Sequence, residues 1–216
     1  MKLSGRFLIL SIIGILSMSL SSCGEKMHKA LITTEYGDIT VLLYNSTPKH
    51  RDNFIKLVKE GFYDDLLFHR VINEFMIQGG DPDSKTATPG TPLGAGGPGY
   101  EIDAEIGAPH LRGALAAART PNPQKKSSGS QFYIVTGRKQ NDPELKYYEK
   151  QRGITYNEVQ RKIYMEEGGY PSLDMEYTVF GEVLSGMEVV DKISQLEKDQ
   201  GNRPVKDVRM KIKMIN

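Results

Sequence analysis

Residues 68–81 carry the most informative pattern in the chain, and they read Phe68-His69-Arg70-Val71-Ile72-Asn73-Glu74-Phe75-Met76-Ile77-Gln78-Gly79-Gly80-Asp81. Apolar and polar residues alternate within 68–72 and again within 75–78, which is typical of strands with one buried face. We therefore predict two short strands joined by a bend at Asn73-Glu74. If they fold towards one face, Arg70, Phe75, Met76 and Gln78 lie close together. They then form a mostly apolar pocket with few polar groups, the usual composition of a small-ligand site.

Other parts of the chain are also expected to form strands, over residues 30–34, 39–44, 113–118, 131–136, 177–183 and 208–215. Two helices are expected among them. One begins after Thr47, with Pro48 at the first helical position, and the other covers residues 186–196. Each has an apolar stripe at helical spacing. Many short strands framed by two helices favour a mainly antiparallel β-barrel or sandwich.

Residues 137–171 interrupt this pattern with a polar, helical segment. Asp142-Pro143 favours the start of one helix, and Gly153 favours its end. Residues 155–158, Thr-Tyr-Asn-Glu, have the form of a capping box that starts a second helix. Val159 and Ile163 are expected to face inward. We interpret the segment as a surface insertion of two short helices that the barrel does not need in order to fold, and not as a separate domain.

Three more blocks accompany residues 68–81 and follow them in the chain. They read Gly113-Ala114-Leu115-Ala116-Ala117-Ala118-Arg119, Gly129-Ser130-Gln131-Phe132-Tyr133-Ile134-Val135-Thr136 and Leu173-Asp174-Met175-Glu176-Tyr177-Thr178-Val179-Phe180-Gly181. Together the four blocks resemble the cyclophilin-type peptidyl-prolyl cis-trans isomerases. Four motifs in the family's order are a more specific signal than one short motif. The resemblance extends from about Ala30 to Ile215, interrupted mainly by the insertion.

The resemblance implies a fold and a set of functional residues. The implied fold is an eight-stranded antiparallel β-barrel capped by two α-helices, formed by residues 30–216, with the active groove on its outer face. Arg70 is then the catalytic residue. The implied substrate-binding residues are Phe75, Met76, Tyr133 and Leu173 around the proline ring, Gln78 and Gln131 on the peptide backbone, Ala118 and Arg119 beside the residue before proline, and Tyr177, where many relatives carry histidine.

The same resemblance implies no metal and no cofactor, because rotation about an amide bond needs neither. His28, His50 and His110 are scattered and show no metal-ligand spacing. His69, inside the first motif, is expected to make structural hydrogen bonds. The expected partners are proline-containing polypeptides.

Each of these residues also has an ordinary structural explanation when it is taken alone. Arg70 is then a surface ion-pair partner, Phe75 and Met76 are core residues, and Tyr133 lines the barrel. The order of the motifs favours function for the set. The main hypothesis is an isomerase that assists the folding of exported proteins. A proline-peptide-binding chaperone or scaffold module without essential turnover is the alternative, and a structural envelope lipoprotein is a third.

The first 22 residues have the composition of a bacterial export signal. Lys2 and Arg6 precede a mostly apolar run over residues 7–18, which is too short and too broken to favour a membrane-spanning helix. The sequence Leu20-Ser21-Ser22-Cys23-Gly24 resembles the lipobox of bacterial lipoproteins, and Cys23 is the only cysteine in the chain. We expect residues 1–22 to be removed, Cys23 to be lipidated, and residues 23–29 to form a tether. An ordinary signal peptide followed by a chance cysteine is the alternative.

Charge gives no support for a nucleic-acid partner. Without residues 1–22, the chain holds 26 basic and 27 acidic residues, a net charge of −1. A balance of this kind favours neither nucleic acid nor anionic lipid.

Gly24 follows the cysteine, where aspartate would favour retention in the inner membrane by analogy with enteric bacteria. We therefore expect a monomer in the bacterial cell envelope, anchored by lipid to the outer membrane and facing the periplasm.

Overall fold

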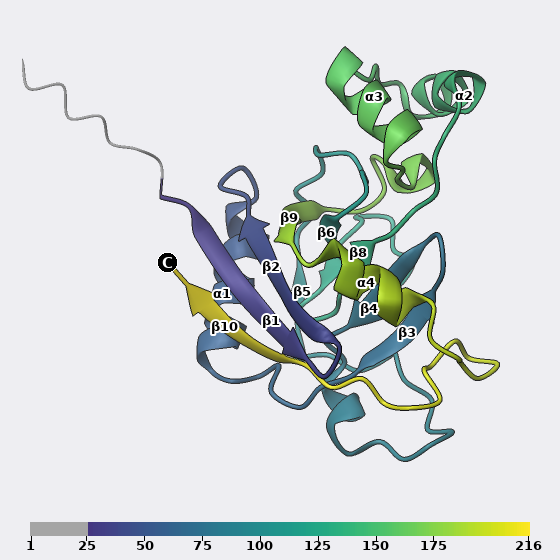
Figure 1. Ribbon diagram of the computed structural model, residues 1–216. Coiled ribbons are helices and arrows are strands. Elements are labelled where there is room, and N and C mark those ends of the chain that lie inside the picture. The colour runs from purple at the N-terminus through teal and green to yellow at the C-terminus, as the bar shows by residue number, and fades with distance from the viewer. Residues whose placement is uncertain (1–25) are drawn as a thin grey trace, which may run out of the picture.

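The computed structural model describes residues 26–216, so the expected signal peptide, Cys23 and the first part of the tether lie outside the described residues. Its strands are β1 (His28–Thr34), β2 (Gly37–Leu43), β3 (Phe68–Ile72), β4 (Met76–Gly79), β5 (Glu101–Ile102), β6 (Ala114–Ala117), β7 (Ser127–Ser128), β8 (Phe132–Val135), β9 (Val179–Ser185) and β10 (Lys211–Ile215). Its helices are α1 (Pro48–Lys59), α2 (Asp142–Arg152), α3 (Glu158–Glu166) and α4 (Met187–Ser194), with short 3₁₀ turns η1 (Pro82–Thr86) and η2 (Pro171–Leu173) (Figure 1).

Eight strands form one curled antiparallel sheet in the order β10-β1-β2-β9-β6-β8-β4-β3. Its two edges approach each other. The backbone N–H of Phe68 donates to the carbonyl of Val208 at 2.9 Å, and the N–H of Met210 donates to the carbonyl of Leu66 at 2.8 Å. Because these bonds join the start of β3 to the segment before β10, the sheet curls towards a barrel. The eight-stranded antiparallel fold expected from the sequence is confirmed.

The helices α1 and α4 pack against the sheet with their apolar faces. From α1, Phe54, Leu57 and Val58 are buried, and from α4, Val189, Val190 and Ile193 are buried. The ring of Phe54 meets those of Tyr63, Phe132 and Phe180, with centroids 5.2–5.7 Å apart. Burial of such large rings is the main favourable contribution to a core that contains no disulfide.

The strands predicted on either side of Asn73-Glu74 are both present. β3 and β4 pair antiparallel, and Glu74 adopts a positive φ of 57° in the turn between them. In the register, Arg70 lies opposite Gln78, and Gln78 lies opposite Tyr133 of β8. Directly opposed residues point to the same face of a sheet. The register therefore brings these three side chains together.

The insertion is helical, as predicted, and α2 and α3 project from the rest of the domain (Figure 1). Two details of the prediction are wrong. The second capping box is formed by Asn157 and Gln160, because the hydroxyl-bearing Thr155 lies outside the helix start. Val159 does not face inward, since 67% of its surface is exposed. The hydrophobic cluster of the insertion is formed instead by the buried residues Leu145, Tyr156 and Tyr164.

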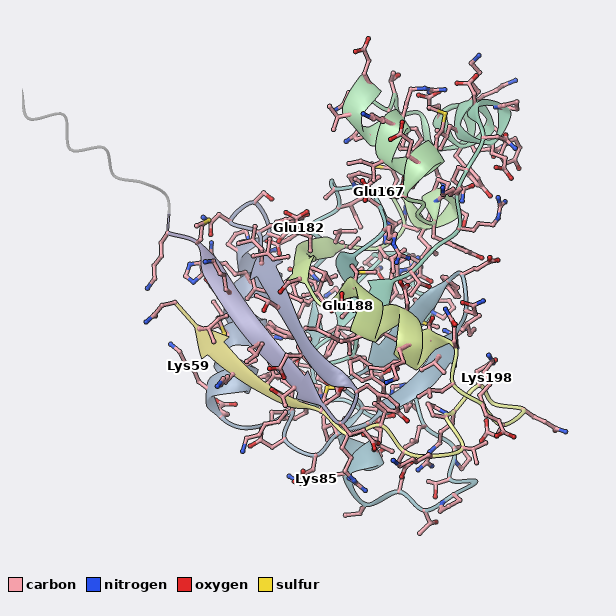
Figure 2. All side chains as sticks on the ribbon, in the orientation of Figure 1. Lys59, Lys85, Glu167, Glu182, Glu188 and Lys198 are labelled. Atoms are coloured by element: carbon pink, nitrogen blue, oxygen red, sulfur yellow. The ribbon has the colours of Figure 1, made fainter. Side chains whose placement is uncertain are left out.

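Charged side chains cover the outside of the domain. Lys59 and Lys85 lie at the outer edge of the domain (Figure 2). Within residues 26–216, no helix has both the length and the apolar composition needed to cross a membrane.

Candidate active site

A small cavity lies on the outer face of the sheet, with a volume of about 100 Å³. Strands β3, β4 and β8 supply part of its wall, and the segments after β6 and before β9 supply the rest. Its lining consists of nine of the ten predicted site residues: Arg70, Phe75, Met76, Gln78, Ala118, Arg119, Tyr133, Leu173 and Tyr177. These residues are far apart in the sequence, and the fold brings them together as predicted.

Gln131, the tenth predicted residue, does not line this cavity. It lines a neighbouring one of about 420 Å³, together with Gln78, Ala118, Arg119 and the glycine-rich residues 94–97. Since Gln78, Ala118 and Arg119 line both cavities, the two adjoin. An extended peptide with one residue in the smaller cavity has room for an earlier or later residue in the larger one.

A line of side-chain amides connects Arg70 to the glycine-rich loop. Arg70 Nη1 donates to Gln78 Oε1 at 3.2 Å, and Gln78 Nε2 donates to Gln131 Oε1 at 3.0 Å. Gln131 Nε2 in turn donates to the carbonyl oxygens of Gly94, at 3.0 Å, and Gly96, at 2.7 Å. Each amide is held at both ends. The guanidinium of Arg70 therefore has a defined position before any ligand arrives.

The positive charge of Arg70 is not neutralised by a carboxylate among residues 26–216. Its guanidinium carbon lies 5.7 Å from the centroid of the Phe75 ring, which it contacts through a cation–π interaction. A guanidinium carries five N–H donors, and the bond to Gln78 uses one of them. The half-buried Arg70 can thus offer several charged donors to a ligand in the cavity.

Arg119 differs from Arg70 because it is fully engaged. Its side chain stacks on Tyr177, with 4.6 Å from the guanidinium carbon to the ring centroid. It also donates to the backbone carbonyl and the carboxylate of Glu176, at 3.1 and 3.3 Å. Arg119 therefore forms a wall of the cavity, with much of its charge already paired.

Tyr133 lines the cavity and is 5% exposed. Burial raises the pKa of its hydroxyl well above the ordinary value, so the hydroxyl keeps its proton. That hydroxyl lies 3.0 Å from Nε2 of His110, which is completely buried. The sequence pattern did not point to His110 or to its partner Asp174. The one available signal was the position of Asp174 inside a motif, directly after Leu173.

His69 does not make the hydrogen bonds expected of it. Both ring nitrogens are buried, and neither has a partner in hydrogen-bonding geometry among the described residues. Burial lowers the pKa of His69 to about 4 from the ordinary value of 6.5, against the weaker opposing effect of Asp81. The imidazole of His69 is therefore neutral near pH 7, whereas Arg70, the next residue in the chain, is charged.

This lowered pKa makes the stability of the domain depend on pH. Between pH 6.5 and pH 4 the unfolded chain binds the proton at His69 more readily than the folded chain does. The free energy of unfolding therefore falls as the pH falls through this window. We expect a loss of about 2 kcal/mol between pH 6.5 and 4.5, from about 1.4 kcal/mol per unit of pKa difference.

Urea unfolding at the two pH values measures this loss, and a His69→Leu variant is the control. The variant should lose less stability than the wild type over the same interval. The pKa of His50 is also lowered by burial, so some pH dependence should remain in the variant. Equal losses in the two proteins would contradict the assignment to His69.

Comparison with known proteins connects this cavity to a family. Residues 29–214 match the family model described as cyclophilin type peptidyl-prolyl cis-trans isomerase/CLD. The chain belongs to the cyclophilin family.

A Staphylococcus aureus protein whose name assigns it to the peptidyl-prolyl cis-trans isomerases is 36% identical over 182 residues, with 83% of this chain and 87% of the relative covered. A Streptococcus pyogenes protein named as a bifunctional phosphatase and peptidyl-prolyl isomerase is 38% identical over 188 residues. The chain spans only 37% of its length.

Solved cyclophilin structures share the fold. A Cryptosporidium parvum cyclophilin-type isomerase superposes with a TM-score of 0.63 at 25% identity, covering 88% of this chain and 99% of the other. The same protein in the presence of the dipeptide Ala-Pro gives a TM-score of 0.62 at 26% identity, covering 87% of this chain and 99% of the other. This cyclophilin is therefore a peptidyl-prolyl cis-trans isomerase, and its family acts on proline-containing peptides.

Proposed function

We propose that this cyclophilin rotates X-Pro peptide bonds in exported proteins, with the proline ring in the 100 Å³ cavity and Arg70 acting on the bond itself. The observation that carries the proposal is the position of Arg70. A charged donor without a carboxylate partner in the described part of the chain lines the cavity together with the apolar side chains of Phe75, Met76 and Leu173. The cavity suits a single small ring, and its neighbour suits an adjoining residue of the peptide.

The chemistry required of Arg70 follows from the amide bond. Rotation about X-Pro passes over a barrier of roughly 18–20 kcal/mol, because it destroys the amide resonance. In the twisted transition state the nitrogen lone pair is no longer delocalised, so the nitrogen becomes a better hydrogen-bond acceptor. A guanidinium aimed at that nitrogen binds the twisted amide more tightly than the planar one, which is the condition for catalysis.

The other lining residues hold the two sides of the bond. Phe75, Met76, Tyr133 and Leu173 grip the proline ring, so that the preceding residue is the part that rotates. Gln78 and Gln131 hold the peptide backbone through their amides, which their shared hydrogen bond already orients. Ala118 and Arg119 lie beside the residue before proline, and Tyr177 supports Arg119 by stacking.

A binding module without essential turnover would use the same groove, and exchange NMR on an Ala-Pro peptide separates the two functions. The isomerase should produce exchange cross-peaks between the cis and trans forms when the protein is far below the peptide concentration. A pure binder should shift or broaden the peptide signals without cross-peaks. Within residues 26–216 the guanidinium of Arg70 has no carboxylate partner, which favours the isomerase, since binding alone does not require a free charged donor.

We also propose that the enzyme acts as a monomer on the cell envelope, held by lipid on Cys23. The proposal rests on the export signal and on the cysteine that follows it, both in residues 1–25. A single acyl chain gives only marginal membrane binding, whereas two or more anchor a protein stably. The absence of aspartate after the cysteine supports the outer membrane, with the domain facing the periplasm.

Replacement of Cys23 by serine should prevent the attachment of lipid to the protein. The wild type should sediment with the membrane fraction, and its mass should show residues 1–22 replaced by lipid on Cys23. The Cys23→Ser variant should appear in the soluble envelope fraction or remain as an uncleaved precursor without lipid. A lipid-free wild-type protein with a mature N-terminus at another residue would rule out the anchor.

A further inference from the structure

Two tyrosines of the insertion reach from its helices into the interior of the domain. Tyr156 precedes α3 and is 4% exposed, and Tyr164 lies on α3 and is fully buried. Their hydroxyls both donate to Oδ2 of Asp174, at 2.6 and 2.7 Å. Tyr147, on the neighbouring helix α2, is 58% exposed instead. The insertion therefore directs two specific hydroxyls towards a single carboxylate oxygen.

Asp174 is buried and receives four hydrogen bonds. Besides the two tyrosine hydroxyls on Oδ2, its Oδ1 accepts from the backbone N–H of His110 at 2.7 Å and lies 2.9 Å from the ring Nδ1. No Lys or Arg side chain pairs with Asp174 in the described part of the chain. A buried charge without a cationic partner depends on such donors, since an unpaired one is strongly unfavourable. Two of the four come from the insertion.

The contacts continue from Asp174 to the wall of the proline cavity. A carboxylate only accepts hydrogen bonds, so Nδ1 of His110 carries the proton that faces Asp174. When the ring carries only that proton, Nε2 accepts a hydrogen bond, and the Tyr133 hydroxyl, 3.0 Å away, is its donor. The two rings lie nearly parallel, at 13°. The position of the Tyr133 ring thus depends on Asp174 through His110.

Two further contacts place the insertion against the same cavity. Leu173, the residue before Asp174 in the chain, lines the cavity with Tyr133. Tyr170, at the end of the insertion, packs on Phe75 with ring centroids 4.3 Å apart, and its backbone N–H donates to the carbonyl of His110 at 2.8 Å. The insertion or Asp174 therefore supports three of the residues that line the cavity, namely Phe75, Tyr133 and Leu173.

We propose that Tyr156 and Tyr164 are positioning residues for the isomerase, which act through Asp174 and His110 to hold the wall of the proline cavity. This inference rests on the proposed function, in which the cavity takes the proline ring. The grip on the ring is the same in the planar and the twisted peptide. Weakening it removes binding of both states alike, which raises KM and leaves kcat nearly unchanged.

The test is the double variant Tyr156→Phe/Tyr164→Phe, which keeps both rings packed and removes only the hydroxyls. We expect the affinity for an Ala-Pro peptide to fall about tenfold, because the walls that hold the proline ring are less firmly positioned. The exchange rate at saturation should stay within twofold of the wild-type rate. The ¹⁵N signals of the His110 ring should shift, since its partner Asp174 has lost two donors. The matched control Tyr147→Phe should change none of these quantities.

A purely structural role for the two hydroxyls would lower the unfolding free energy without altering the folded site. A folded double variant with wild-type affinity and unshifted His110 signals would overturn the inference. If the double variant does not fold, the single variants decide. Each should weaken affinity about two- to threefold, and wild-type affinity in both would be equally decisive against it. A wild-type protein that catalyses no exchange would instead contradict the proposed function.

Discussion

Replacing Arg70 with alanine is expected to lower kcat/KM for X-Pro isomerisation by about 10²–10³-fold, comparable to removing one preorganised donor from an active site. The reason is that the guanidinium interacts with an amide nitrogen that accepts a hydrogen bond only when twisted. The fold should persist, because Arg70 is half-buried on the outer face and makes no ion pair with a carboxylate within residues 26–216. The measurement is exchange NMR on an Ala-Pro peptide, with unfolding by urea as the check on the fold.

Two further variants sharpen this result. Arg70→Lys keeps the positive charge but loses the planar fork and the stacking on Phe75, so it should recover only part of the activity. Arg138→Ala removes an arginine that is paired with Glu144 on the insertion, away from the cavity, and activity should stay at the wild-type level. An Arg70→Ala protein that is folded and fully active would exclude the proposed mechanism.

Replacing Gly80 with alanine should destabilise the domain by about 4 kcal/mol. Gly80 has a φ of +90°, in the region that residues with a side chain rarely adopt, and holding such a residue there costs roughly 1–3 kcal/mol. An added Cβ would lie 2.3 Å from the carbonyl oxygen of Ser130 and 3.0 Å from the Cα of Gln131. Relief of this overlap needs backbone shifts that cost roughly 1–3 kcal/mol more.

The same substitution should also weaken activity, since the backbone that must move carries Gln131. Urea unfolding gives the stability, and exchange NMR on the surviving folded fraction gives the activity. Gly90→Ala is the matched control, because Gly90 also has a positive φ, of +83°, but an added Cβ meets nothing within 4 Å. The control should show only the backbone cost. Equal destabilisation of the two variants would show that the contact with Ser130 is unimportant.

Four of the ten predicted site residues could be placed from the sequence pattern, because they are close together in the chain. Arg70, Met76 and Gln78 lie on two adjoining strands, with Phe75 in the turn between them, and alternation along a strand shows which side chains share a face. Tyr133 and Leu173 are different, since nothing in their own segments indicates which strand they neighbour. They could be assigned only through the resemblance to a family. In the structure both residues line the cavity.

The insertion shows where sequence patterns reach their limit. Helical periodicity in α3 suggested Val159 as an inward residue, yet it is 67% exposed, and Tyr164 is buried instead. Tyr156 and Tyr164 also make tertiary hydrogen bonds to Asp174, which local hydrophobicity does not reveal. That the barrel folds without the insertion stays a prediction.

The closing contacts of the sheet have a consequence for the order in which the chain folds. β1 pairs with β10 from Lys29 opposite Ile215 to Thr33 opposite Lys211, so the first strand depends on the last. The other edge, at Leu67, also finds its partner near the C-terminus, at Arg209. Contacts between such distant residues form slowly, because the intervening chain must first be ordered. A chain in which residues 208–215 have not yet paired therefore has two open strand edges, and an unpaired edge invites association with other chains. Loss of the last six residues should thus promote aggregation more than loss of surface charge does.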